Sequence, residues 1–211
     1  MNIKVCGITQ FKQLQQLDAL GIDFAGLIFF EGSPRCVKGK IAAREIVDAD
    51  FDLKKVGVFA NADYDTIMPI VDAYNLDCVQ LHSNESTKLC KALSKEVEVI
   101  KTFHFQENEN AEIENKLQLY DDVCDYFLFD AFNKDGLSAA LESSFDWNQL
   151  SNFTFEKPFF LGGEIGFADI NKINLVNHPD LFAIDLNSKF EISTGVKDLV
   201  SVMQFKKNLI R

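Results

Sequence analysis

Short, almost entirely apolar runs recur along the chain at a spacing that few folds can accommodate. From the first run, which starts at Ile3, to the eighth, which starts at Phe182, the average spacing is about 26 residues. That length holds one strand, one helix and two short loops. Runs without polar alternation are typical of parallel strands that are buried on both faces. We expect strands at Ile3–Cys6, Phe24–Phe30, Lys55–Phe59, Asp77–Leu81, Val97–Lys101, Asp125–Asp130, Pro158–Leu161 and Phe182–Leu186.

Helix-sized stretches lie between these runs. Phe11–Leu20 spaces its leucines along one face, and Asp63–Asn75 begins with an Asp that can cap a helix. Ser86–Leu93 and Ala111–Tyr120 show the same pattern. The alternation predicts the α/β class: a single (β/α)₈ barrel with a parallel eight-stranded core that forms one domain over residues 1–211.

An open, doubly wound sheet is the rival architecture. That fold usually carries a glycine fingerprint directly after its first strand. Here the first turn reads Cys6-Gly7-Ile8-Thr9, with a single glycine. The barrel is therefore the preferred prediction.

The charge balance limits the partners that such a chain can bind. Acidic residues outnumber basic ones by 32 to 21, which gives a formal net charge of −11. A surface this acidic repels nucleic acid and anionic membranes, so neither is an expected partner. An anionic small molecule remains possible where a pocket has local positive potential.

The cysteines indicate a reducing compartment. There are five of them, widely spaced and without a C-x-x-C motif, which argues against a disulfide framework or a structural zinc site. The first residues carry no basic segment followed by a long apolar one, so no secretion signal is expected. We expect a cytoplasmic protein.

In a (β/α)₈ barrel, the chemistry lies at the carboxyl ends of the strands. Cys6 closes the first expected strand, where it is either a base or nucleophile or simply a buried, inert thiol. Asp130 closes the sixth strand after three apolar residues. Partial burial would raise its pKa and suit a general acid, whereas a helix cap is the alternative role.

Further candidates follow other strands. Arg35, after the second strand, can form a planar fork to a carboxylate or a surface salt bridge. His82, after the fourth strand, is a weaker candidate. His104, in the segment Lys101–His104 that follows the fifth strand, and His178 lie in polar surroundings and are expected to be solvated.

The last two strand ends suit an anion. Gly162 and Gly163 follow the seventh strand, and Asn187 and Ser188 follow the eighth, close to Asp185. Backbone N–H groups at these two loops form the usual phosphate site of such barrels. Glycine alone is a weak signal, because turns need it anyway.

Five segments, in order along nearly the whole chain, carry a family likeness. They are Lys4–Thr9, Gly26–Val37, Val56–Phe59, Val79–His82 and Phe145–Trp147. Together they resemble the phosphoribosylanthranilate isomerase family of tryptophan biosynthesis. Phe182–Ser188 resembles the variant eighth strand of some bacterial members.

The resemblance implies a TIM barrel that isomerises N-(5′-phosphoribosyl)anthranilate by an Amadori rearrangement. It implies Cys6 as general base, Asp130 as general acid and Arg35 as the group that holds the anthranilate carboxylate. Further substrate contacts are expected from His82, Gly162, Gly163, Asp185, Asn187 and Ser188. Neither a metal nor an organic cofactor is expected, because the substrate's own amine forms the iminium that withdraws electrons. A monomer or a weak homodimer is expected.

The chain departs from the family pattern on the phosphate side. The stretch Lys134–Ser144 contains one glycine where the family has a glycine-rich run, Glu164 follows Gly162-Gly163, and Lys189 interrupts the usual Ser-Ser-Gly. Three interpretations stay open: a working isomerase with an altered phosphate loop, an isomerase for a related but less phosphorylated substrate, or a silent paralogue that binds a ligand or protein. The first is preferred, because acid and base are both present.

Overall fold

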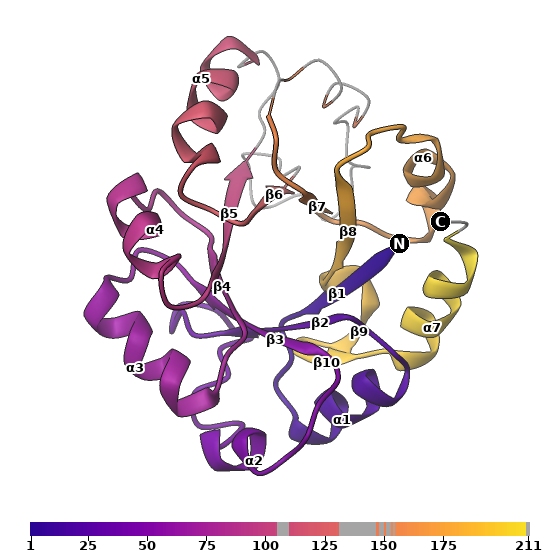
Figure 1. Ribbon diagram of the computed structural model, residues 1–211. Helices are drawn as coiled ribbons and strands as arrows, with labels where there is room; N and C mark the ends of the chain where they lie inside the picture. Colours follow the sequence, from indigo (N-terminus) through magenta and orange to yellow (C-terminus); the bar gives the residue numbers. More distant parts are fainter. Residues whose placement is uncertain (105–109, 131–146, 148–149, 151–152, 154, 210–211) are drawn as a thin grey trace.

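Eight parallel strands close into a barrel in the order β1-β2-β3-β4-β5-β6-β7-β8, and the helices surround it (Figure 1). The computed structural model describes residues 1–104, 110–130, 147, 150, 153 and 155–209. The predicted α/β barrel is confirmed. The strands are β1 (Asn2–Cys6), β2 (Phe24–Ile28), β3 (Lys54–Phe59), β4 (Cys78–Leu81), β5 (Glu98–His104), β6 (Tyr126–Asp130), β7 (Phe159–Gly162) and β8 (Leu181–Leu186).

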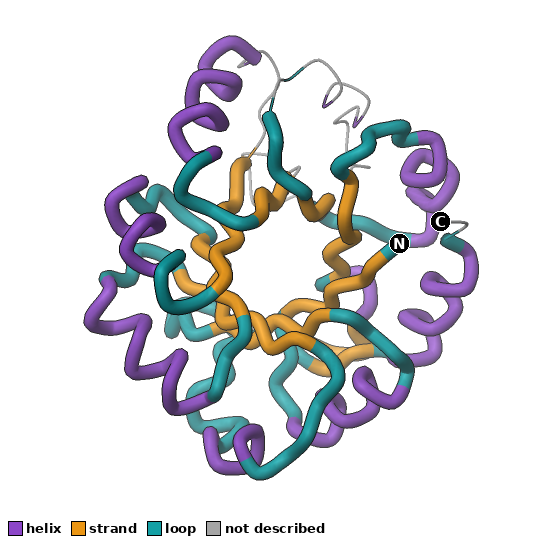
Figure 2. The backbone as a smooth tube through the Cα atoms, viewed as in Figure 1, coloured by secondary structure: helices purple, strands orange, loops and turns teal. Residues whose placement is uncertain are grey.

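The helices form the outer layer, which Figure 2 separates by colour from the strands. They are α1 (Phe11–Ala19), α2 (Ala43–Val47), α3 (Tyr64–Tyr74), α4 (Thr87–Leu93), α5 (Asn110–Asp121), α6 (Ile170–Leu175) and α7 (Leu199–Asn208). A short hairpin of β9 (Glu191–Ser193) and β10 (Val196–Lys197) lies between β8 and α7. Four of these helices match predicted ones, whereas α2, α6, α7 and the hairpin were not predicted.

Local capping explains where several helices begin. The Asp63 carboxylate accepts a hydrogen bond from the Thr66 amide at 2.9 Å and starts α3. Asn75 ends that helix in the left-handed region, at φ 46°. Ser86 caps α4 in the same way as Asp63 caps α3. These caps fix the loops that follow β3 and β4, at the carboxyl ends of the strands.

The lower interior of the barrel is apolar. Each strand from β2 to β8 contributes one side chain to a separate buried cluster, which consists of Phe24, Val56, Cys78, Ile100, Leu128, Phe160 and Ala183. Phe24 of β2 and Phe160 of β7 meet with ring centroids 5.2 Å apart, although their strands are not neighbours. The contact therefore crosses the barrel. The helices cover the outer face of the sheet through a second, larger core.

The upper interior is polar, because side chains two residues apart on a strand point to the same face. Two residues beyond Cys78, Ile100 and Ala183 come Gln80, Thr102 and Asp185. Asp185 is the register partner of Lys4 on β1. One more step of the same alternation reaches Cys6, His82 and His104. The alternation of side chains along each strand thus places a ring of polar groups above the apolar cluster.

Two strands end at other residues than predicted. β5 continues to His104, so the segment expected after this strand is part of it, and β2 ends at Ile28 rather than Phe30. All five cysteines are free. Among the described residues, no helix has both the length and the apolar character that crossing a membrane requires.

Candidate active site

The Lys4–Asp185 ion pair lies at the centre of the polar ring. The Lys4 Nζ atom donates to both carboxylate oxygens of Asp185 at 2.9 Å, and the lysine side chain is completely buried. Burial acts against the charged form of Lys4, but Asp185 and Cys6 outweigh it and raise the pKa of the ammonium group. A permanent positive charge therefore lies beneath the mouth of the barrel.

Cys6, the last residue of β1, is buried beside this charge. Burial raises the pKa of its thiol, and the Lys4 ammonium reduces that rise without cancelling it. Gly26 of β2 is its register partner, and a Cβ atom at Gly26 would lie 2.7 Å from the Cys6 sulfur. A glycine is thus required on β2 to leave room for the thiol.

Asp130, the last residue of β6, is 14% exposed. Burial raises the pKa of its carboxyl to about 6, although the nearby His104 acts in the opposite direction. Lys4 and Asp185 influence the pKa of both Asp130 and Cys6. The structure therefore brings the predicted acid and base around the same ion pair.

His104 ends β5 directly beside Asp130, its register partner on β6. Its Nδ1 atom lies 3.9 Å from a carboxylate oxygen of Asp130, and its side chain is 39% exposed. The prediction of a solvated histidine is right about exposure but misses this contact with Asp130. His82 packs against the edge of the His104 ring at 4.9 Å, and burial lowers the pKa of His82 to about 4. His82 is therefore neutral at neutral pH.

Arg35 forms an ion pair with Glu191, which lies near the C-terminal end of the chain. Its Nε and Nη2 atoms donate to Glu191 at 2.8 and 2.7 Å, and Lys197 donates to the same carboxylate at 2.7 Å. The salt bridge that the sequence left open is thus present, but Glu191 is only 6% exposed. The Nη1 atom lies outside this fork. Gly7, at φ 79°, lets the first loop approach Arg35, because a Cβ atom there would lie 2.7 Å from the Arg35 Cδ atom.

The loops after β7 and β8 meet through Glu164. Ser188 donates a hydrogen bond to the Glu164 carboxylate at 2.8 Å, and Lys189 lies 3.8 Å from it. Gly163 adopts φ 92°, which favours glycine, and Glu164 itself adopts φ 49°. Asn187 is engaged elsewhere, because its carbonyl and side-chain oxygens accept from Lys197. The predicted stretch Lys134–Ser144 lies outside the described residues.

One group of side chains has the composition of a metal site. His82, His104 and Asp130 offer ligand atoms that lie within 4.8 Å of one another. Ligands on one zinc ion, bound at about 2.0–2.2 Å, lie about 3.3 Å apart in a tetrahedron. The three side chains would have to contract to hold an ion, so their arrangement fits proton transfer better than ligation.

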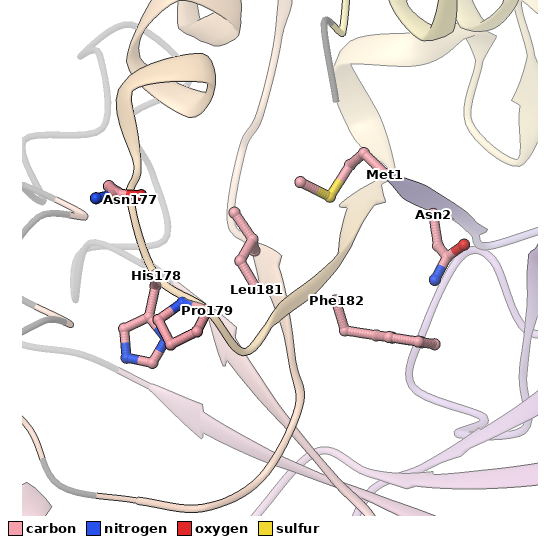
Figure 3. Close-up of a pocket in the computed structure, with 7 residues that line it drawn as sticks. All are labelled: Met1, Asn2, Asn177, His178, Pro179, Leu181 and Phe182. Atoms are coloured by element: carbon pink, nitrogen blue, oxygen red, sulfur yellow. The ribbon is translucent and has the colours of Figure 1, made fainter.

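A cavity of about 460 Å³ lies at the opposite end of the barrel, at the amino ends of β1 and β8 (Figure 3). Met1, Leu181 and Phe182 line it together with His178. His178 was predicted to be solvated, which is wrong: its ring stacks on Phe155 with centroids 5.2 Å apart, and its side chain is 10% exposed. Residues at this end of such barrels serve stability rather than chemistry.

The sequence patterns do not predict several residues of the site. Lys4 lies two positions before Cys6, so strand alternation alone could have placed it inside the barrel. Glu191 and Lys197 come from the hairpin after β8, and nothing in the local sequence connects them to Arg35. Lys101 is buried as well, where it pairs with Glu85 at 3.0 Å and supports the loop after β4.

The buried Lys4–Asp185 ion pair predicts that replacing Lys4 lowers stability far more than replacing an exposed lysine does. Lys4→Met leaves Asp185 buried without its partner and should cost about 3–5 kcal/mol of unfolding free energy. Lys54→Met is the matched control, because Lys54 forms a 2.8 Å ion pair with Glu98 in which both side chains are more than one-third exposed. It should cost at most about 1 kcal/mol. Urea denaturation compares them, and equal losses would contradict the assignment.

Comparison with known proteins gives one consistent result. A family model described as N-(5′-phosphoribosyl)anthranilate (PRA) isomerase matches residues 3–208. The isomerase of that name from Parabacteroides distasonis is 36% identical, with 100% of this chain and 94% of the relative covered. The one from Crocosphaera subtropica is 32% identical, with 99% and 98% covered.

Solved structures agree. The phosphoribosyl anthranilate isomerase of Thermotoga maritima superposes with a TM-score of 0.82 at 26% identity, over 99% of this chain and 98% of that one. A phosphoribosyl anthranilate isomerase in complex with reduced 1-(o-carboxyphenylamino)-1-deoxyribulose 5-phosphate superposes with a TM-score of 0.80 at 27% identity, over the same shares of both chains. The chain belongs to the N-(5′-phosphoribosyl)anthranilate isomerase family.

Proposed function

We propose that this chain converts N-(5′-phosphoribosyl)anthranilate into 1-(2-carboxyphenylamino)-1-deoxyribulose 5-phosphate by an Amadori rearrangement. The observation that carries the proposal is the placement of Cys6 and Asp130 around one buried ion pair, Lys4–Asp185, at the carboxyl ends of the strands. A carboxyl whose pKa is raised to about 6 can hold a proton for donation near neutral pH.

The chemistry divides between these two groups. Asp130 donates its proton to the furanose ring oxygen, and the C1′–oxygen bond breaks as the anthranilate nitrogen forms an iminium. The Cys6 thiolate then removes the proton from C2′, and the electron pair of that C–H bond moves into the C1′–C2′ bond. The resulting enolamine becomes the ketone when C1′ gains the proton held by the Cys6 thiol, which restores the thiolate, and the C2′ hydroxyl releases its proton. The iminium is the electron sink, so the proposal includes no metal or organic cofactor.

The remaining predicted residues are proposed to bind the substrate. Arg35 can offer Nη1 to the anthranilate carboxylate while Glu191 holds its other two donor nitrogens. His82, which is neutral, can serve as a hydrogen-bonding group. Gly162 ends β7, and Gly163 and Ser188 lie on the two loops where such barrels bind phosphate. Asp185 and Asn187 act indirectly, since they position Lys4 and Lys197.

The proposal has a direct test. The purified chain should consume N-(5′-phosphoribosyl)anthranilate, which is followed by the loss of its fluorescence, and should restore growth of a tryptophan auxotroph that lacks the isomerase. A folded protein that does neither would favour the silent-paralogue interpretation. We also propose one barrel domain over residues 1–211, a cytoplasmic location that suits five free cysteines, and a monomer or weak homodimer, which sedimentation can decide.

Glu164 should weaken the binding of a phosphorylated substrate. Its charge influences Asp130 and Arg35, and it reaches across to Ser188 on the other phosphate loop. Repulsion of about 1 kcal/mol, expected for two exposed charges about 4 Å apart, corresponds to about fivefold in affinity. Glu164→Gln should therefore lower KM about fivefold with little change in kcat. Glu96→Gln, an exposed residue near the amino end of β5, is the control that should change neither. An unchanged KM in Glu164→Gln would contradict this role.

A further inference from the structure

The proposed reaction leaves Asp130 without its proton. In each turnover the carboxyl gives one proton to the ring oxygen, and the C2′ hydroxyl later releases one to its surroundings. The balance closes only when Asp130 is protonated again before the next substrate reacts. Its side chain is 14% exposed, so solvent has limited direct access to the carboxylate.

Hydronium is too dilute at alkaline pH to supply this proton at the rate of an ordinary kcat, about 1–10³ s⁻¹, so the proton comes from water or from a buffer acid. Burial of the Asp130 carboxylate restricts its contact with such donors. A more exposed group beside Asp130, which accepts a proton from them and passes it on, would remove this restriction.

We propose that His104 supplies that proton, as a positioning and relay residue that acts through Asp130; this inference rests on the function proposed above. His104 and Asp130 are register partners on β5 and β6, with Nδ1 3.9 Å from a carboxylate oxygen. The His104 side chain is 39% exposed, whereas that of Asp130 is 14% exposed. One histidine thus connects the acid to solvent.

The hydrogen bonding of His104 determines which of its ring nitrogens can transfer a proton to Asp130. Its Nε2 atom lies 2.9 Å from the carbonyl oxygen of His82. A carbonyl can only accept, so Nε2 carries a proton, and the atom that faces Asp130 is Nδ1. Nδ1 takes a proton from solvent and gives it to the carboxylate, which leaves a neutral imidazole and a carboxylic acid. The 3.9 Å gap exceeds a hydrogen bond by about 1 Å, so the ring closes that distance or one water bridges it.

Among the residues that the structure describes, neither Lys4 nor His82 offers this route. Asp185, Lys4 and Glu164 also influence the pKa of Asp130. Lys4 is completely buried and bonded to Asp185, so it exchanges no proton with solvent directly. His82 faces His104 from β4, but burial lowers its pKa to about 4, so it carries too few protons at neutral pH.

The test is rescue of the variant by a small proton donor. His104→Gln retains an N–H donor for the His82 carbonyl but cannot carry a proton. Turnover is measured at pH 8 in dilute buffer and again with increasing concentrations of imidazole. In dilute buffer kcat should be about tenfold below that of the wild type with KM unchanged, and added imidazole should restore it, because its acid form then protonates Asp130. His178→Gln, at the opposite end of the barrel, should behave as the wild type.

Each other outcome is informative. A lower kcat in His104→Gln that imidazole does not restore would assign His104 a structural role and overturn the relay. Wild-type rates throughout in His104→Gln would overturn it as well. A wild-type chain that does not consume N-(5′-phosphoribosyl)anthranilate at all would instead refute the proposed function.

Discussion

Replacement of Asp130 by asparagine should lower kcat/KM at least a hundredfold and make the protein more stable at pH 8. The activity falls because an amide cannot donate a proton to the ring oxygen, and a lost general acid ordinarily costs about 10²–10⁴-fold. The measurement is the loss of substrate fluorescence at several pH values. Asp72→Asn, on the exposed face of α3, is the matched control that should leave activity unchanged.

The gain in stability follows from the raised pKa of Asp130. Its carboxyl titrates at about 6 in the folded chain and at about 3.8 in a solvated reference state. Between these pH values the folded state keeps a proton that the unfolded state has lost, so stability falls as pH rises, and the deficit is complete above about pH 6. About two pKa units correspond to about 3 kcal/mol.

Asp130→Asn removes this penalty, since asparagine is neutral at every pH. Urea denaturation at pH 8 should therefore show a gain of up to about 3 kcal/mol of unfolding free energy, and at pH 3.5 the gain should vanish. Asp72→Asn should show no such difference between the two pH values. A variant that is no more stable than the wild type at pH 8 would mean that Asp130 is not a buried, strained acid.

The second large effect concerns Cys6. Cys6→Ser should lower kcat at least a hundredfold with only a small change in stability, because a hydroxyl occupies nearly the same space but is a far weaker base. Gly26→Ala is a steric comparison: its Cβ atom would press on the sulfur from 2.7 Å without altering the chemistry of the thiol. It should also slow turnover, but less than Cys6→Ser does.

The pKa values of the two groups predict an unusual pH profile. The reaction needs Asp130 protonated and Cys6 deprotonated, although the pKa of Asp130 is about 6 and burial raises that of Cys6 above its ordinary value of 9.0. Below pH 6 the rate rises with the thiolate fraction. Between the two values the gain in thiolate offsets the loss of the protonated acid, so the rate is level, and above the higher value it falls.

This profile is measured as kcat/KM against pH, together with the ultraviolet absorbance of the thiolate in the wild type and in Cys6→Ser. The thiolate of Cys6 should appear only on the alkaline side. A rate that falls steadily above pH 6 would show that Cys6 is already ionised there. In that case the burial of the thiol would not control its ionisation.

The strand pattern predicted much of this site, because it depends on local periodicity. Cys6 and Asp130 end strands whose apolar runs are visible in the sequence, and the barrel brings such ends together. The same periodicity would have placed His104 inside the barrel, two residues beyond Thr102. The predicted strand ends at Lys101, whereas β5 continues to His104, so the prediction left this histidine outside the strand.

The sequence patterns do not predict contacts between residues that lie far apart in the chain. The fork from Arg35 to Glu191 joins residues that lie 156 positions apart, and no periodicity connects a loop to a hairpin. His178 was misjudged for the same reason: its polar neighbours along the chain suggested solvent, whereas Phe155 covers its ring. The Glu164–Ser188 hydrogen bond likewise depends on how two loops meet. Such contacts come from tertiary packing, which local sequence does not encode.

The most direct test follows one substrate through three proteins. Wild type, Cys6→Ser and Asp130→Asn, each shown to be folded, are mixed with N-(5′-phosphoribosyl)anthranilate, and the loss of its fluorescence is recorded. The account predicts turnover by the wild type and a loss of at least a hundredfold in each variant. Turnover that survives in either variant, or its absence in a folded wild type, would contradict the claim that this thiol and this carboxyl share the reaction.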